Sequence, residues 1–223
     1  MAWQVERWRA IEGFEHGFGD RLEIPPGGVA TLRQVHGREV FRVEAIVTQE
    51  TTGDGLVVDR PGSRAGVWTA DCVPVHFVAP RARVAAAVHC GWRGSAAGII
   101  PEALDLLGRD FAVPANEVEA ALGPSIGGCC YEVGLEVREA FLGRAGARLG
   151  AAGFEERGGK LRLDLRSFLT AELMDLGVGY VERIGPCTSC RTDLLHSYRR
   201  QPQTKGRQLS WVGWQASGVP TSL

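Results

Sequence analysis

Two reactive side chains, Cys72 and His89, each stand at one end of an apolar run with the composition of a buried strand. They are 17 positions apart, the spacing that two strands and a tight connection need to bring both side chains to one rim. His36 lies 36 residues before Cys72 and follows another short apolar run. Two imidazoles and one thiolate leave one position of a tetrahedral metal open, which is typical of catalytic zinc. The trio therefore predicts a metal site.

Each of these residues taken alone has a simpler interpretation. Cysteine is among the residue types most often buried, and a histidine at a strand end usually packs or satisfies a polar group. The trio stands out because a turn-forming or strand-breaking residue follows each member, namely Gly37, Pro74 and Gly91, and loops at strand ends carry functional side chains. A metal-free pair, with Cys72 as nucleophile and His89 as its base, is a second hypothesis.

Two charged residues beside the trio are candidates for catalysis. Arg93 opens a predicted helix, where its guanidinium is suited to bind an anion together with helix N–H groups. A solvated surface arginine is the alternative. Asp71 precedes Cys72 and is suited to act as a base or to hold a ligand imidazole. Equally, Asp71 could end a strand and do nothing more.

Four further cysteines form two pairs, Cys129-Cys130 and Cys187-Thr-Ser-Cys190. Together they would supply the four sulfur ligands of a zinc site, but adjacent cysteines are an unusual half-site compared with the common paired spacing. We rank this hypothesis behind buried or substrate-lining cysteines. A thioredoxin-like redox role is weaker still, because no strand–C-x-x-C–helix unit begins a βαβ pattern.

The elements that must position these residues are mostly short strands. Apolar runs rich in Val and Ala, bounded by Gly and Pro, predict buried strands rather than helices. Two short strands are expected within residues 1–28, and the others over 29–35, 39–47, 56–58, 65–70, 73–79, 84–88, 118–122, 161–163, 180–184 and 208–213.

Helical periodicity is found in three places. The first helix follows Gly94 and has an apolar face from Ala96 to Leu107, with Ser95 as a candidate cap and Pro101 as a kink or restart. The second spans about 133–141, and the third is capped by Asp164. Consecutive strands with only three helices predict a mixed α/β fold, α+β in character, of packed mixed β-sheets flanked by helices, in a single domain over 1–223.

Charge and hydrophobicity limit the kinds of molecule that this protein is expected to bind. A net charge of −1 argues against nucleic acid as the main ligand, and the basic stretch 196–207 suits a phosphate or carboxylate, or simply solvent, better. The N-terminus is charged where a signal peptide would be apolar, and no apolar run approaches the roughly 20 residues of a membrane span. We expect a cytoplasmic protein that acts on a small molecule.

Several motifs, in this order along the chain, resemble the multicopper polyphenol oxidase family, also called the laccase-domain family. They are Gln34-Val-His-Gly37, Thr69-Ala-Asp-Cys-Val-Pro74, Val88-His-Cys-Gly-Trp-Arg-Gly94, Gly123-Pro-Ser-Ile-Gly127, Cys129-Cys-Tyr-Glu-Val-Gly134, Cys187-Thr, Ser197-Tyr-Arg-Arg200 and Gly206-Arg207. The resemblance covers roughly residues 13–214.

The resemblance implies packed mixed sheets and a zinc ion held by His36, Cys72 and His89. It also implies phosphorolysis of purine nucleosides (adenosine, inosine, guanosine, methylthioadenosine) and deamination of adenosine, with nucleoside and phosphate as the substrates. Asp71 and Arg93 are then the candidate catalytic residues. An alternative implied by the same family is a hydrolase that removes L-serine from a UDP-muramoyl precursor of peptidoglycan. A partner-binding protein without activity ranks last.

The chain departs from the family in a few places. The stretch from Gly17 to Gln34 is shorter than usual, with Arg21 as the candidate substitute for a missing arginine, and Gly128 and Cys90 replace the usual proline and alanine. A multicopper oxidase needs about ten histidines as ligands, and this chain has five. Zinc is therefore the expected metal, with copper ranked behind it.

Overall fold

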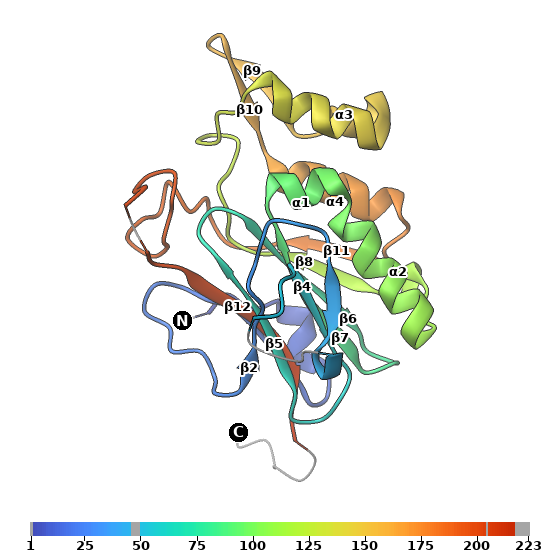
Figure 1. Cartoon of the computed structure of the whole chain (residues 1–223). Helices are drawn as coiled ribbons and strands as arrows, with labels where there is room; N and C mark the ends of the chain where they lie inside the picture. Colours follow the sequence, from blue (N-terminus) through green and yellow to red (C-terminus); the bar gives the residue numbers. More distant parts are fainter. Residues whose placement is uncertain (1, 46–49, 204, 217–223) are drawn as a thin grey trace.

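Two β-sheets packed face to face, with helices over the outer face of the larger sheet, form the core of the protein (Figure 1). The structure is a computed structural model that describes residues 2–45, 50–203 and 205–216. The fold is mixed α/β, as the sequence predicts. No helix in these ranges is long and apolar enough to cross a membrane.

The larger sheet has six strands in the order β11-β8-β6-β7-β4-β3. Its centre is the antiparallel pair β6 and β7, and the edge pairs β3–β4 and β8–β11 are parallel. The mixed directions confirm a sheet that is not doubly wound. The strands are β3 (Val40–Arg42), β4 (Gly55–Val58), β6 (Val73–Ala79), β7 (Val84–Cys90), β8 (Glu119–Leu122) and β11 (Tyr180–Arg183).

The smaller sheet has four strands in the order β1-β12-β5-β2. Its strands are β1 (Phe14–Phe18), β2 (Val29–Ala30), β5 (Arg64–Thr69) and β12 (Gln208–Trp214). A separate hairpin joins β9 (Phe154–Arg157) to β10 (Lys160–Leu163). The ends of the described chain thus meet in one sheet, since β1 pairs with β12 in antiparallel register.

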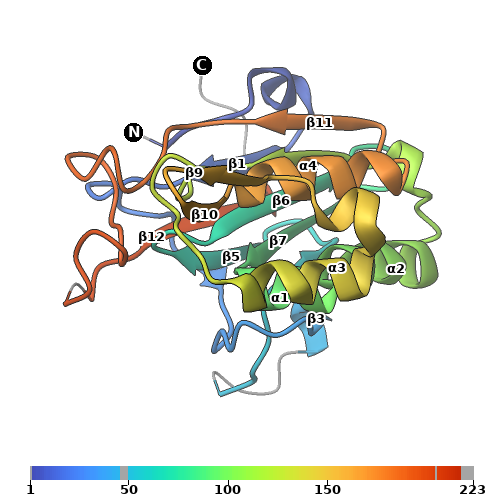
Figure 2. The same ribbon diagram turned by 90° about the horizontal axis from the view of Figure 1, so that it is seen from above.

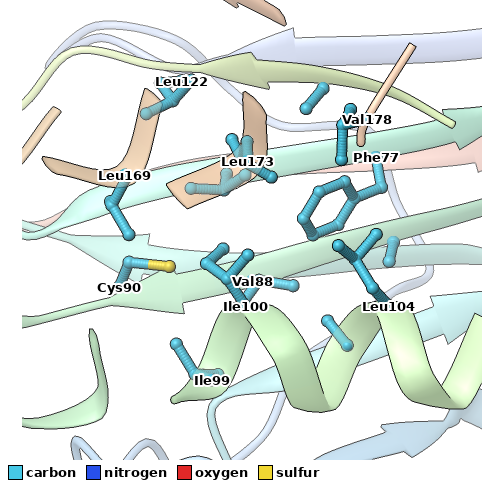
Figure 3. Packing of buried hydrophobic residues seen from close by; sticks show 14 of the residues in the cluster. Phe77, Val88, Cys90, Ile99, Ile100, Leu104, Leu122, Leu169, Leu173 and Val178 are labelled. Atoms are coloured by element: carbon cyan, nitrogen blue, oxygen red, sulfur yellow. The ribbon is translucent and has the colours of Figure 1, made fainter. Parts of the chain in front are cut away.

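The helices are α1 (Trp92–Ala97), α2 (Ile99–Phe111), α3 (Leu135–Gly150) and α4 (Leu165–Asp175). Figure 2 shows them spread across the six-stranded sheet, with α4 toward β11 and α2 toward β3. Side chains of β6 point alternately to the two faces of the six-stranded sheet. Val75 and Phe77 pack under the helices, while Val78 faces the smaller sheet. Figure 3 shows Phe77 against residues of α2 and α4.

Two predicted strands are shorter than expected. The strand predicted over 29–35 is only Val29–Ala30, because the backbone then leaves the sheet and Arg33 bonds with Thr51 and Gly53 instead. The strand predicted over 39–47 ends at Arg42 and turns into a 3-10 helix, Val43–Ala45, and its last two residues lie outside the described residues.

The N-terminal segment also differs from the prediction. Residues 2–28 contain one strand, β1, and a 3-10 helix over Glu6–Ala10 in place of two strands. Trp3 makes only an isolated bridge with Phe18. The strand β9, which the sequence pattern did not indicate, pairs with β10 through charged and exposed residues that lack an apolar alternation.

The predicted first helix is two helices that break at Gly98. Gly98 has φ = 91°, and its N–H bonds to the carbonyls of Gly94 and Ser95 to close α1. Ser95 is buried within α1 and caps neither helix, so that prediction is wrong. Pro101 lies in the first turn of α2, where its missing N–H costs no hydrogen bond, and it marks a restart. Asp164 caps α4 as predicted, accepting from the Ser167 N–H and hydroxyl.

Candidate functional site

His36, Cys72 and His89 converge at one rim of the two sheets. His36 lies in the loop between β2 and β3, Cys72 in the turn between β5 and β6, and His89 near the end of β7. Their ligand atoms all lie within 4.8 Å of one another. The backbone is shaped for this approach, since a Cβ at Gly91 would lie 2.9 Å from a His36 ring carbon and 3.2 Å from the Cys72 sulfur. The structure thus brings together the trio that the spacing predicts.

Asp54 orients one of the imidazoles. Its carboxylate is fully buried and lies 2.7 Å from Nδ1 of His89. The same carboxylate accepts backbone N–H bonds from Val35, His36 and Gly37 at 2.7–3.2 Å. Because the Nδ1–H of His89 donates to this carboxylate, Nε2 of His89 is left to bind a metal. One side chain therefore positions two members of the trio.

The sequence pattern does not identify Asp54 as a site residue, because it lies in the turn directly before β4. The sequence reasoning offered Asp71 as a possible partner of a ligand imidazole, but the structure gives this role to Asp54. The one available signal is an aspartate between Gly53 and Gly55 directly before a buried strand. That signal is shared with ordinary turns.

The trio favours a bound cation electrostatically. Burial raises the pKa of Cys72, but the charge of His89 and hydrogen bonds from both imidazoles lower that pKa to about 6 overall. Burial lowers the pKa of His89, but the Cys72 thiolate and Asp54 raise it to about 9. A thiolate held beside two imidazoles is a donor set that fits zinc, since the ion replaces the shared proton as the counter-charge.

Asp71 ties three loops together. Its backbone is left-handed, with φ = 98°, and its carboxylate accepts the Thr188 hydroxyl and the Arg199 N–H, each at 2.6 Å. The Asp71 carbonyl accepts from Ile126 at 2.9 Å. His36 also has a left-handed backbone, with φ = 59°. Non-glycine residues in this region cost backbone energy, and such strain is concentrated at functional sites.

A pocket of about 690 Å³ opens over the trio. Besides the trio, its wall has three arginines and four large aromatic residues, Arg93, Arg199, Arg207, Trp68, Trp92, Tyr131 and Tyr198, and it includes Asp71. Both candidate catalytic residues of the sequence, Asp71 and Arg93, therefore lie in this pocket. Arg21 is not in the lining, and its guanidinium bonds to the Thr192 carbonyl instead.

Aromatic rings hold two of the pocket arginines. The guanidinium carbon of Arg93 lies 4.5 Å from the ring centre of Trp92, and that of Arg199 lies 5.2 Å from the ring centre of Tyr131. Both arginines remain exposed. Neither makes a side-chain bond to a carboxylate within the described ranges, so both can bind an anion.

Tyr131 is the second site residue that sequence reasoning missed. Burial raises its pKa to about 12, as do the charges of Cys72 and Asp71, against the opposing effect of Arg199 and Arg93. Its hydroxyl is therefore protonated at neutral pH and able to donate a hydrogen bond. The only sequence signal is its place directly after Cys129-Cys130, in a motif quoted for its family likeness.

The remaining cysteines divide into two kinds. Cys90 is buried in the core under the helices. Cys129, Cys130, Cys187 and Cys190 come together, with sulfur atoms all within 4.8 Å of one another. The structure thus juxtaposes the two pairs that the sequence hypothesis of a four-sulfur site combines.

Known proteins match this chain over nearly its whole length. The family described as multi-copper polyphenol oxidoreductase laccase matches residues 9–215. The chain is 36% identical over 207 residues to "Purine nucleoside phosphorylase PA4543" of Pseudomonas aeruginosa, covering 93% of this chain and 81% of that protein. It is 35% identical over 187 residues to "Purine nucleoside phosphorylase YfiH" of Escherichia coli, covering 84% and 74%.

A solved structure has the same fold. The crystal structure of protein NMB0706 of Neisseria meningitidis superposes with a TM-score of 0.83 at 27% identity, covering 94% of this chain and 97% of that one. The agreement extends across both sheets and the helices, because so little of either chain is left unmatched.

Proposed function

The chain belongs to the multi-copper polyphenol oxidoreductase laccase family, and on that basis we propose that it is a zinc-dependent purine nucleoside phosphorylase with an adenosine deaminase side activity. Its substrates are phosphate and a purine nucleoside such as adenosine, inosine, guanosine or methylthioadenosine. The observation that carries the proposal is a three-ligand group, His36, Cys72 and His89, at the base of a pocket that also has free arginines and aromatic rings.

The trio would hold one zinc ion and leave one coordination position for substrate or water. When bound, zinc supplies a Lewis acid that polarises a substrate oxygen or lowers the pKa of a water. Asp54 keeps Nδ1 of His89 protonated and so holds Nε2 in the ligand state. The family description mentions several coppers, but the five histidines of this chain are too few for that ligand set.

The pocket walls suit the two substrates. Arg93 and Arg199 supply guanidinium groups for phosphate, which such groups bind through paired N–H bonds. Trp68 and Tyr198 are 40% and 54% exposed and supply ring faces for a purine, and stacking of one base on an aromatic ring contributes about 1–3 kcal/mol. Tyr131 donates its hydroxyl proton to a substrate oxygen or nitrogen.

We assign Asp71 a positioning role. Both of its carboxylate oxygens already accept hydrogen bonds, from Thr188 and from the Arg199 backbone. A carboxylate whose two oxygens accept from Thr188 and Arg199, neither of them a member of the trio, is better suited to fix the Arg199 loop than to move a proton. This revises the catalytic role expected for Asp71 from its place beside Cys72.

One specific observation favours a second candidate, a metal-free hydrolase. Cys72, His89 and Asp54 form a thiol–imidazole–carboxylate series, and the lowered pKa of Cys72 would give a thiolate at neutral pH. The third member of the trio, His36, has no role in such a mechanism. Chelation separates the two candidates, because it abolishes a zinc enzyme and spares a thiolate hydrolase.

The test is chromatography of adenosine incubated with the purified protein, with and without phosphate. Phosphate-dependent release of adenine and ribose 1-phosphate supports the phosphorylase. Inosine formed without phosphate supports the deaminase. If zinc-loaded protein leaves adenosine unchanged under both conditions, the proposal is wrong, and a UDP-muramoyl peptide carrying L-serine becomes the substrate to assay.

A further inference from the structure

Four cysteines outside the proposed active site lie on two loops that adjoin its pocket. Cys129 and Cys130 lie in the turn between β8 and α3, and Cys187 and Cys190 lie in the turn after β11. The Cys190 sulfur is 3.5 Å from the Cys130 sulfur and 3.7 Å from the Cys129 sulfur. All four sulfur atoms fit within 4.8 Å of one another. The protein therefore gathers four thiols from segments about 60 residues apart in the chain.

These separations match one kind of sulfur site. With zinc–sulfur bonds of about 2.3 Å, a regular tetrahedron places its sulfur atoms about 3.8 Å apart. A disulfide would bring two of them to about 2.05 Å, and all four cysteines are free thiols. Four thiols at van der Waals contact, with room for a small ion between them, fit a tetrathiolate metal site.

Local backbone geometry resolves the objection raised by adjacent cysteines. Cys130 and Tyr131 both donate backbone N–H bonds to the Gly127 carbonyl, at 2.9 and 3.0 Å, so the chain here is a tight turn. In a helical turn neighbouring side chains diverge by only about 100°, whereas in a strand they point to opposite faces. Cys187 begins a similar turn, since its carbonyl accepts from Cys190 and Arg191. Each pair can therefore face a common centre.

The surroundings supply positive charge and hydrogen-bond donors. The Gly127 N–H donates to the Cys187 sulfur at 3.2 Å. Arg162 donates to the Cys129 carbonyl at 2.7 Å, and Arg166 donates to the Gly185 carbonyl at 2.9 Å, two positions before Cys187. A tetrathiolate zinc site carries two negative charges, and N–H donors and nearby cations of this kind stabilise it.

We propose that Cys129, Cys130, Cys187 and Cys190 bind a second zinc ion, in a structural site distinct from the His36, Cys72 and His89 group. Four protein ligands close the coordination sphere, as is typical of structural zinc. The inference does not rest on the phosphorylase activity, because it concerns the thiol geometry alone.

The second site would fix one wall of the pocket. Tyr131 follows Cys130 directly, and Thr188 follows Cys187 and donates to Asp71 at 2.6 Å. The two loops are also joined by the Gly127 bond to the Cys187 sulfur and by a short bridge, in which the Thr188 N–H donates to the Ser125 carbonyl at 3.0 Å. Zinc at the four cysteines would hold these two loops together. It would thereby fix the positions of Tyr131 and Asp71 in the pocket wall.

Metal analysis of the purified full-length protein tests this site directly. We expect two zinc ions per chain in the wild type, one in Cys72→Ser, one in Cys190→Ser and none in the double variant. Cys90→Ala is the matched control, because it removes a buried cysteine outside both groups and should keep two ions. A single zinc that is lost with Cys72 would overturn the proposal.

X-ray absorption at the zinc edge of Cys72→Ser provides a readout that does not need a cluster variant to fold. The expected spectrum has a sulfur-only shell at about 2.3 Å. Nitrogen ligands in that shell, the absence of zinc from this variant, or a disulfide between any two of the four cysteines in freshly isolated protein would each contradict a tetrathiolate site.

Discussion

The Asp54 carboxylate and the His89 imidazole lie 2.7 Å apart in a fully buried contact, and the same carboxylate caps the backbone of the His36 loop. Two proposed ligands, one on a loop and one on β7, are therefore aligned by one side chain that does not line the pocket. The alignment would be lost if Asp54 lost its charge, even with both imidazoles intact.

Asp54→Asn should weaken zinc binding at the trio about 10- to 100-fold, the usual effect of removing a ligand's hydrogen-bond partner. A neutral amide accepts the hydrogen bond from Nδ1–H of His89 more weakly, and its single oxygen cannot also accept from all three backbone N–H groups. Zinc affinity measured by competition with a chelating dye checks this. Asp59→Asn is the control, since Asp59 pairs with Arg42 away from the site. Equal affinities for both variants would contradict the positioning role.

The thiol of Cys72 should be unusually reactive in chelator-treated protein. Its pKa is lowered to about 6, so the thiolate is already dominant at pH 7, and alkylation by iodoacetamide should rise with pH through a midpoint near 6. His89→Ala should move that midpoint upward, because it removes the main favourable charge. The rate at each pH is followed by mass spectrometry of the Cys72 peptide. A midpoint near the ordinary thiol value of about 8.5 would rule out this electrostatic account.

The free energy of unfolding should decrease at acidic pH because of His16. Burial lowers its pKa to about 4, as does Arg9, and its Nε2 accepts the Val5 N–H at 2.8 Å, which requires the neutral ring. The unfolded chain takes up a proton near pH 6.5 and the folded one only near 4, so stability is complete above 6.5 and is lost as the pH falls through this window. The loss attributable to His16 is about 3 kcal/mol.

His16→Gln should therefore flatten the pH dependence of the unfolding free energy between pH 6.5 and 4, measured with denaturant. Burial also lowers the pKa of His76, so the wild-type slope contains both residues and only the difference between the two proteins reports on His16. Parallel slopes for wild type and variant would show that His16 does not titrate in this window.

Arg93→Ala and Arg199→Ala should each raise KM for phosphate by roughly 10- to 100-fold, because a hydrogen bond to a charged group contributes about 1.5–3 kcal/mol. Arg109→Ala serves as the matched control, since Arg109 is exposed at the end of α2 and pairs with Asp110. Steady-state phosphorolysis at varied phosphate gives the comparison. If the Arg93 variant keeps its phosphate affinity, Arg93 has no part in phosphate binding.

The positioning role of Asp71 predicts that Thr188→Val reproduces part of the effect of Asp71→Asn. Thr188→Val removes the 2.6 Å bond that joins the β5–β6 turn to the Cys187 loop, and Asp71→Asn weakens it, because a neutral amide oxygen is a poorer acceptor than a carboxylate. We expect both to lower kcat/KM without moving the pH profile, because neither removes a proton donor or acceptor of the reaction. A shift of the profile in Asp71→Asn alone would instead identify Asp71 as an acid or base.

The apolar strands were predictable because a strand that is buried on both faces has a nearly continuous run of apolar residues. β6 spans Val73–Ala79 as predicted, and the cap at Asp164 is a local hydrogen bond that the sequence pattern indicates. The trio was predictable because its members stand at the ends of such strands or beside breakers. His36 nevertheless lies on a loop rather than at a strand end, since backbone bonds to Thr51 and Gly53 end the pairing early.

The site residues that the sequence did not predict make their contacts with residues that are distant in the sequence. Asp54 serves His89 from 35 positions away, and nothing in its own neighbourhood indicates that partner. Tyr131 lines the pocket, and the four charged groups that affect its pKa come from other segments. The helix break likewise depends on a left-handed residue at Gly98, while Pro101, the more conspicuous breaker, fits the first turn of α2 without strain.

We propose zinc-dependent phosphorolysis at the His36, Cys72 and His89 group. Its most direct test is to treat wild-type and Cys72→Ser protein with a chelator and then to follow adenine release from adenosine and phosphate as zinc is added back. We predict that activity returns with zinc in the wild type and stays absent in Cys72→Ser. Phosphorolysis by Cys72→Ser at the wild-type rate, or by wild-type protein free of zinc, would contradict the claim.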